Sequence, residues 1–70
     1  MSGENFINQA HRLVGQEVEI ITTEGVYSGT LLSAGRDFLV LETRISGRIV
    51  RMIIRFALIV ALFRLIRGIF

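Results

Sequence analysis

The last 28 residues of this 70-residue chain differ sharply from the rest, and the difference limits what the chain can fold into. Residues 43–70 hold eighteen apolar side chains, six arginines and four small or polar residues, with no acid. Six acids and two arginines precede them, so the formal charge is −4 on residues 1–42 and +6 on residues 43–70. Three interpretations compete: a membrane segment, a nucleic-acid surface, or a subunit that buries its C-terminal part against copies of itself.

The length allows a single domain over residues 1–70. A chain this short buries only about 60% of its unfolded surface when it folds, so a lone monomer is marginally stable. Hydrophobic residues make up 51% of the chain, which is more than one small interior can hold. The excess predicts an interface with protein or lipid.

The residue types needed for catalysis or metal binding are scarce. The chain has no cysteine and one histidine, His11, and it shows no Ser-His-Asp set, paired carboxylates or phosphate-binding loop. We therefore expect no enzyme activity, no cofactor and no metal site. The chain does not begin with a basic segment followed by an apolar one, which is the pattern of a secretory signal. We therefore expect a cytoplasmic location.

An apolar stripe at helical spacing predicts a short helix over residues 4–14. The stripe consists of Phe6, Ile7, Ala10, Leu13 and Val14. From residue 16 the period changes to two, which places Val18, Ile20 and Thr22 on one face of a predicted strand.

Turn residues then divide the middle of the chain into further strands. A second strand is predicted over residues 26–33, and Gly29 inside it indicates a bulge or a sharp bend. A third strand is predicted over residues 38–43, followed by a turn at Ser46-Gly47. Strands that recur at about this spacing are typical of a small all-β barrel or sandwich.

The last third of the chain allows two interpretations. Four arginines are spaced so that they would share one face of a cationic helix lying on a membrane. They are Arg44, Arg48, Arg51 and Arg55. Isoleucine and valine are frequent here, however, and β-branched residues favour strands. Strands over residues 48–54 and 58–63, joined by a bend at 55–57, are the preferred prediction.

The longest uninterrupted apolar run covers residues 56–63. A transmembrane helix needs about 20 apolar residues, so we expect no membrane span. Eight apolar residues in a row instead favour a strand that is buried on both faces. For a strand at the edge of a small barrel, a second subunit has to cover one of those faces.

Two segments carry a recognisable pattern. The first runs from residue 18 to residue 42 and includes a Gly turn, the triplet Gly29-Thr30-Leu31 and an apolar third strand. The second begins Ile53-Ile54-Arg55 and continues as a short apolar strand. Together they resemble the two motifs of the Sm and Sm-like proteins. The resemblance covers residues 5–63 and is closest to small bacterial members of that family.

The resemblance implies a mainly β fold: a short N-terminal helix (about 4–14), a five-stranded, strongly bent Sm-like (SH3-like) barrel (about 16–63) and an apolar C-terminal tail (64–70). It also implies a homo-oligomeric ring of six or seven copies, in which the fourth strand of one copy pairs with the fifth strand of the next. The residues expected at this interface are Arg48, Val50, Arg51, Ile53, Leu58, Val60, Leu62, Ile69 and Phe70. Plain barrel core is the competing interpretation for Ile53 and Val60, with Val40, Leu41 and Ile59.

In RNA-binding Sm-like proteins, the loop after the second strand and the motif arginine contact RNA. The corresponding residues here are Arg36, Asp37, Phe38, Arg55 and Phe56, and the family's loop Asp falls on Gly35 or, with a shift, on Asp37. The correspondence is partial, because Phe38 or Leu39 stands where the family has a base-contacting Asn. Phe56 also replaces the glycine that follows the motif arginine. For Phe38, its place in a strand favours core packing over base stacking.

Two functions therefore remain open for this chain. The first is an RNA-binding ring, in which arginines contact phosphates. The second is a structural oligomer without nucleic acid, in which Arg48 or Arg51 forms salt bridges with acids of a neighbouring subunit. The candidate acids are Glu17, Glu19 and Glu42. In the second interpretation, Ile69 and Phe70 dock on a neighbouring subunit or ring.

Overall fold

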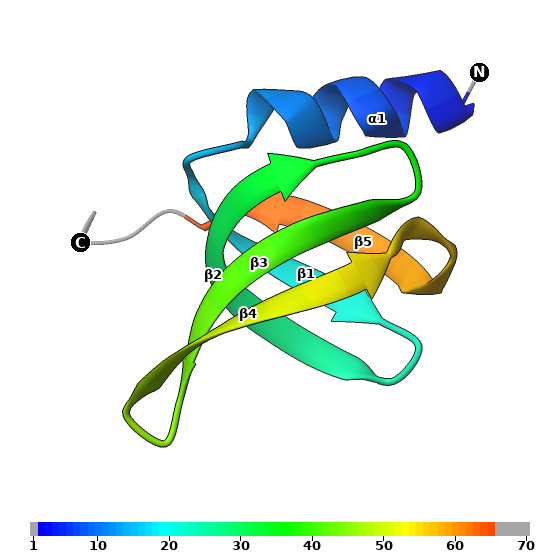
Figure 1. Ribbon diagram of the computed structural model, residues 1–70. Coiled ribbons are helices and arrows are strands. Elements are labelled where there is room, and N and C mark those ends of the chain that lie inside the picture. The colour runs from blue at the N-terminus through cyan, green and yellow to red at the C-terminus, as the bar shows by residue number, and fades with distance from the viewer. Residues whose placement is uncertain (1, 66–70) are drawn as a thin grey trace.

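The computed structural model describes residues 2–65, which form one helix followed by five strands (Figure 1). The elements are α1 (Ser2–Arg12), β1 (Glu17–Thr22), β2 (Gly25–Ala34), β3 (Phe38–Ile45), β4 (Arg48–Arg55), the 3-10 turn η1 (Phe56–Leu58) and β5 (Ile59–Arg64). This order confirms the mainly β fold with one short N-terminal helix.

The five strands form one antiparallel sheet in the order β4-β3-β2-β1-β5. The two strands from the apolar, arginine-rich part of the chain are therefore its two edge strands. Figure 1 shows that β2 and β3 curve strongly and that α1 lies across one end of the sheet. The core inside this curve consists of Ala10, Val18, Ile20, Leu31, Leu39, Leu41, Ile54 and Leu62.

Strand β1 follows the predicted alternation over its whole length. Val18, Ile20 and Thr22 are buried, and the residues between them are partly exposed. Thr22 is polar, but its Oγ1 donates a hydrogen bond to the Gly25 carbonyl (2.8 Å) and accepts one from the Glu24 N–H (3.1 Å). These two bonds satisfy the buried hydroxyl and close the turn between β1 and β2.

Gly29 permits the close approach of β2 and β3. A Cβ atom at this position would collide with the Glu42 carbonyl oxygen and would lie 3.1 Å from the Thr43 Cα. Beside it, the Thr43 hydroxyl donates a hydrogen bond to the Ser28 carbonyl (2.6 Å). The irregularity in the β2–β3 ladder falls between Leu31 and Ser33, so Gly29 allows close packing rather than forming the bulge.

The last third of the chain is extended, which confirms the strand prediction over the amphipathic helix. Ser46 and Gly47 both have positive φ (52° and 79°), as the two central residues of a tight β-hairpin turn require. Ile45 and Arg48 face each other across this turn. No helix within residues 2–65 is long and apolar enough to cross a membrane.

Helix α1 begins and ends two residues earlier than predicted. Of its predicted apolar stripe, Ala10 is fully buried and Phe6 and Leu13 pack against the core. Val14 lies beyond the helix and is 39% exposed. The chain turns at Gly15 (φ 91°), whose N–H donates to the Leu31 carbonyl (2.7 Å) and joins this turn to β2.

Candidate functional site

The residues predicted to contact nucleic acid come together at one end of the β3–β4 pair. Phe38 and Arg55 are direct cross-strand partners. The Phe56 N–H donates to the Asp37 carbonyl (2.8 Å), which ties the start of η1 to the loop before β3. Arg36, Asp37 and Arg55 are exposed, so a small surface with both charges and one aromatic ring faces solvent.

The two phenylalanines of this surface have different environments. Phe38 is 42% exposed, so the expectation that it packs in the core is wrong. The reason is its position: it lies on the face of β3 opposite the buried Leu39 and Leu41. Phe56 is half-buried and makes an edge-to-face contact with Phe6 of α1, with ring centroids 5.0 Å apart and planes at 89°. Phe56 therefore fastens the helix to the core, and Phe38 is the ring available to a ligand.

The apolar residues of β4 and β5 are mostly not core. Ile53 is 69% exposed and Val60 is 67% exposed, so the plain-core interpretation is wrong for both. The structure also exposes Ile49 (61%) and Phe63 (42%), which the sequence did not single out. Their apolar character inside edge strands was the signal that could have identified them.

The other predicted interface residues divide into four groups. Arg48 and Arg51 are exposed, and Val50 and Leu58 are half-buried. Leu62 belongs to the core of its own subunit, at 6% exposure. Ile69 and Phe70 lie outside the described residues, as does most of the predicted tail. Glu42, an expected salt-bridge partner from a neighbour, is the cross-strand partner of Arg51 within the same chain.

The open edge of β4 follows from its hydrogen bonds to β3. In an antiparallel pair, alternate residues of an edge strand direct their N–H and C=O groups away from the partner strand. The bond from Phe56 to Asp37 and the register of the pair place Ile49, Arg51 and Ile53 in this outward set. The backbone groups and the apolar side chains that β4 leaves uncovered thus belong to the same residues.

The open edge of β5 differs, because α1 reaches it. The Leu65 N–H donates to the Glu17 carbonyl (2.9 Å), so the register directs the backbone groups of Leu62 and Arg64 away from β1. Gln9 of α1 donates a hydrogen bond from Nε2 to the Leu62 carbonyl (3.2 Å). One acceptor on the β5 edge therefore already has a side-chain partner.

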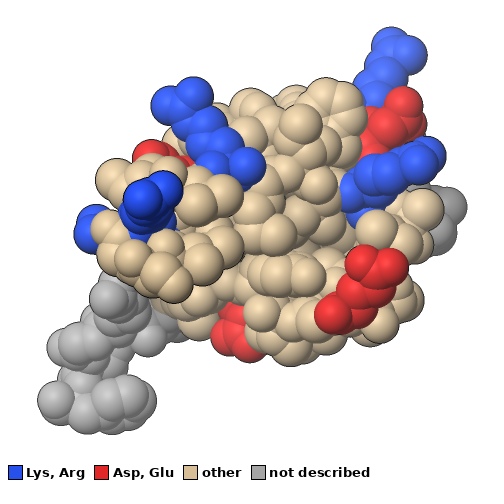
Figure 2. Space-filling model, turned by 60° about the horizontal axis from the view of Figure 1, so that its bottom comes forward, with Lys and Arg blue, Asp and Glu red and all other residues tan. Residues whose placement is uncertain are grey.

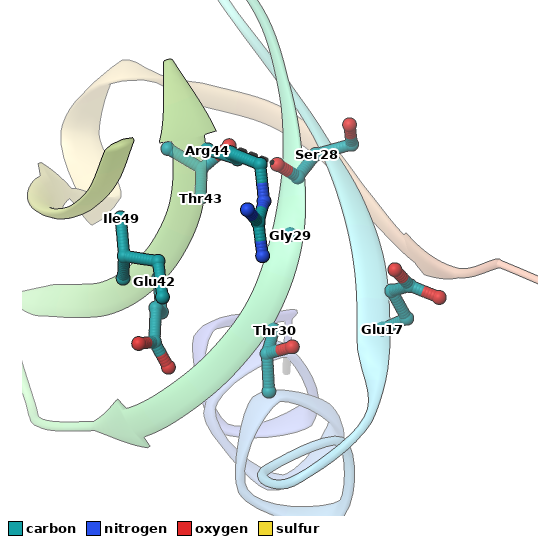
Figure 3. Close-up of a pocket in the computed structure, with 8 residues that line it drawn as sticks. All are labelled: Glu17, Ser28, Gly29, Thr30, Glu42, Thr43, Arg44 and Ile49. Atoms are coloured by element: carbon teal, nitrogen blue, oxygen red, sulfur yellow. Dashed lines mark hydrogen bonds between the residues drawn. The ribbon is translucent and has the colours of Figure 1, made fainter. Parts of the chain in front are cut away.

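A hollow of about 440 Å³ lies over the bend of the sheet, on strands β1 to β4 (Figure 3). It is lined by Glu17, Ser28, Gly29, Thr30, Glu42, Thr43, Arg44 and Ile49. Figure 3 shows Arg44 extending across it, with Glu42 and Glu17 on opposite sides. A smaller cavity of about 140 Å³ lies beside the β4 edge and is lined in part by Ile53, Leu58 and Tyr27. The sequence predicted neither cavity, because strands far apart in the chain form their walls.

Charge is unevenly distributed over the surface. Figure 2 shows arginines at two ends of one face, separated by a broad area without charged side chains. Among residues 2–65, no three His, Cys, Asp or Glu side chains gather in a way that could hold a metal ion.

The sequence matches no protein-family model and no curated protein.

Proposed function

We propose that this chain is an Sm-like subunit that assembles into a ring-shaped homo-oligomer. In this proposal the open edge of β4 in one copy pairs with the open edge of β5 in the next. The observation that carries the proposal is the exposure of Ile53 (69%) and Val60 (67%) on the two edge strands. The motif resemblance adds the strongly bent barrel and a ring of six or seven copies.

Pairing of the two open strand edges would satisfy their backbone hydrogen-bonding groups and bury their exposed apolar side chains. Unpaired N–H and C=O groups on an edge strand invite uncontrolled association, and a partner strand satisfies them. Burying an exposed Ile or Val side chain contributes about 1.5–3 kcal/mol, and the contribution recurs at every seam. Because the two edges differ, the contact runs head to tail, and a ring is the arrangement that leaves no edge open.

The measurement that tests assembly is the native mass of the purified protein. We expect one discrete oligomer of six or seven subunits. Ile53→Lys and Val60→Lys should each shift the protein toward monomer, because a buried lysine at the seam is costly. Val26→Lys is the matched control, since Val26 is 58% exposed but lies on the internal strand β2. A monomeric wild-type protein, or equal effects from all three substitutions, would contradict the proposal.

RNA binding is the second candidate function, and the exposed Phe38–Arg55 pair favours it. A phenyl ring and a guanidinium plane side by side can both stack on bases, while Arg36 nearby can contact a phosphate. We expect single-stranded RNA to bind with an affinity that falls steeply as salt rises, and Arg55→Ala or Arg36→Ala to weaken binding. Arg12→Ala, at an exposed position of α1, is the control. Absence of RNA binding at low salt would contradict this function and favour a structural oligomer that binds no nucleic acid.

A further inference from the structure

The end of the β3–β4 hairpin carries a group of exposed side chains, of which Ile49 also belongs to the outward set of the β4 edge and Arg48 to the predicted ring interface. We call the six residues 44–49 the hairpin tip. Its side chains are two arginines, Arg44 and Arg48, and two isoleucines, Ile45 and Ile49, all exposed. Ile45 is 51% exposed and Ile49 is 61% exposed. In Figure 1 this hairpin ends far from α1 and from the N-terminus.

Each face of the hairpin tip carries one arginine and one isoleucine, and the face with Arg44 and Ile49 also lines the hollow. Cross-strand partners share a face, and the partners here are Arg44 with Ile49 and Ile45 with Arg48. Successive residues point to opposite faces, so one face carries the first pair and the other face carries the second. A protein partner that docks on one face would leave an isoleucine exposed on the other. A medium that surrounds the hairpin tip on both sides would cover both isoleucines.

We propose that the hairpin tip binds an anionic lipid surface. At a bilayer interface, aliphatic side chains enter the acyl boundary while guanidinium groups stay among the phosphates. The charge fits best at Arg48, because residues 43–70 contain no acid, whereas Arg44 on the other face extends across the hollow between Glu42 and Glu17. The turn fits as well, because the positive φ of Ser46 and Gly47 fixes the tight hairpin that holds all four side chains at its end.

The hairpin tip is separate from the candidate RNA site. Phe38 and Arg55 lie at the opposite end of the same two strands, seven residues along β3 from Ile45. At about 3.3 Å per residue, this separation is about 23 Å measured along the curved strand. Substitutions in one site can therefore be read without direct disturbance of the other.

The expected strength depends on the proposed ring assembly. An arginine near an anionic membrane contributes about 1 kcal/mol, so a single tip with two arginines binds weakly. A cyclic ring places every copy of the tip at the same height along its axis, so several tips can touch one flat bilayer together. The proposal thus predicts firm binding by the oligomer and weak binding by a single subunit.

The first experiment is flotation of the full-length protein with vesicles. Phosphatidylcholine vesicles containing phosphatidylglycerol should carry the protein, and pure phosphatidylcholine vesicles should not. Arg48→Gln should weaken binding at least fivefold, which is the factor equivalent to about 1 kcal/mol. Arg12→Gln removes the same charge at an exposed position of α1 and should leave binding unchanged. Ile45→Ser with Ile49→Ser should weaken binding without any change in charge.

A second experiment reports insertion directly. The chain has no tryptophan, so Ile49→Trp creates a single fluorescent reporter. With anionic vesicles, its emission should shift to the blue and brominated lipid should quench it, whereas glycerol phosphate in solution should do neither. Val26→Trp, at another exposed site, should show no response. The native mass of each variant confirms that it still assembles.

The outcomes separate the possible explanations. A blue shift at Ile49→Trp in a protein that proves monomeric would support the lipid contact and contradict the ring. An intact oligomer with no vesicle binding would overturn the lipid proposal and leave assembly standing. Equal loss from Arg12→Gln and Arg48→Gln would also overturn it, because net charge alone would then explain binding. If Arg48→Gln weakens RNA binding while vesicles never bind, the hairpin tip is a nucleic-acid contact instead.

Discussion

Strands β1 and β4 use the same two-residue alternation but place different side chains on their outward faces. In β1, three of six residues are buried, and the partly exposed residues that alternate with them are Glu17, Glu19 and Ile21. In β4, one of eight residues, Ile54, is buried, while Ile49 and Ile53 are exposed. Strand β1 lies inside the sheet and β4 lies at its edge. The outward face of β1 carries two glutamates and Ile21, all partly exposed, whereas that of β4 carries the exposed Ile49 and Ile53 with Arg51 between them. In the proposed ring, this face of β4 is the one that a neighbouring copy covers.

The largest effect is expected inside the sheet, at Gly29. Gly29→Ala puts a methyl group against the Glu42 carbonyl, and the β3 backbone cannot retreat without losing its ladder. We expect the free energy of unfolding to fall by about 3 kcal/mol or more, measured by denaturant titration. Gly35→Ala is the control, because its new Cβ would meet its nearest atom at 3.5 Å, an ordinary contact. Similar losses at the two glycines would contradict the close-packing argument.

The comparison between buried and outward residues is tested most directly by Leu41 and Ile53. Leu41 is fully buried, so Leu41→Ala should lower the free energy of unfolding by about 3 kcal/mol at any protein concentration. Ile53→Ala should change the stability of dilute protein by only about 0.5 kcal/mol. It should instead reduce the rise of Tm with protein concentration that assembly produces. An equal loss from both substitutions in dilute protein would break the comparison.

The alternation in β1, the turn at Ser46-Gly47 and the five-strand order along the chain were all predictable, because each depends on neighbours in sequence. The β-branched residues of the last third favoured strands over a helix, and the structure confirms the strands. Strand ends shifted by one or two residues, since packing at the ends of the sheet decides them.

The sites were harder to predict because they depend on register. Whether Ile53 points inward or outward is decided by its pairing with Val40, and a shift of one residue would reverse it. The exposure of Phe38 has the same cause. The contact between Phe6 and Phe56 joins residues 50 positions apart, and no local pattern indicates it. The sequence identified which residues were unusual, and pairing determined what each of them faces.

A smaller effect is expected where α1 meets the sheet, at the Phe6–Phe56 contact. Both rings are half-buried, so Phe6→Ala or Phe56→Ala should each cost about 2 kcal/mol of stability. In a double-mutant cycle, the edge-to-face geometry predicts a coupling of about 1 kcal/mol between the two rings. Phe38→Ala is the control and should cost less, because that ring is 42% exposed. A coupling of zero would show that the helix is held by other contacts.

The smallest effect, and the one that separates the two edges, is expected at Gln9. Gln9→Met keeps the length and helix propensity of the side chain but removes the donor to the Leu62 carbonyl. We expect the single subunit to lose about 1 kcal/mol of stability, because one part-buried hydrogen bond is gone. Association should become tighter, because that carbonyl on the β5 edge is then free for a strand from a neighbour.

The loss of subunit stability is measured by denaturant titration of dilute protein, and the gain in association is measured by native mass on dilution. Asn8→Met, at an exposed position one residue earlier, should change neither. Weaker association in Gln9→Met would mean that α1 supports the seam rather than competing with it.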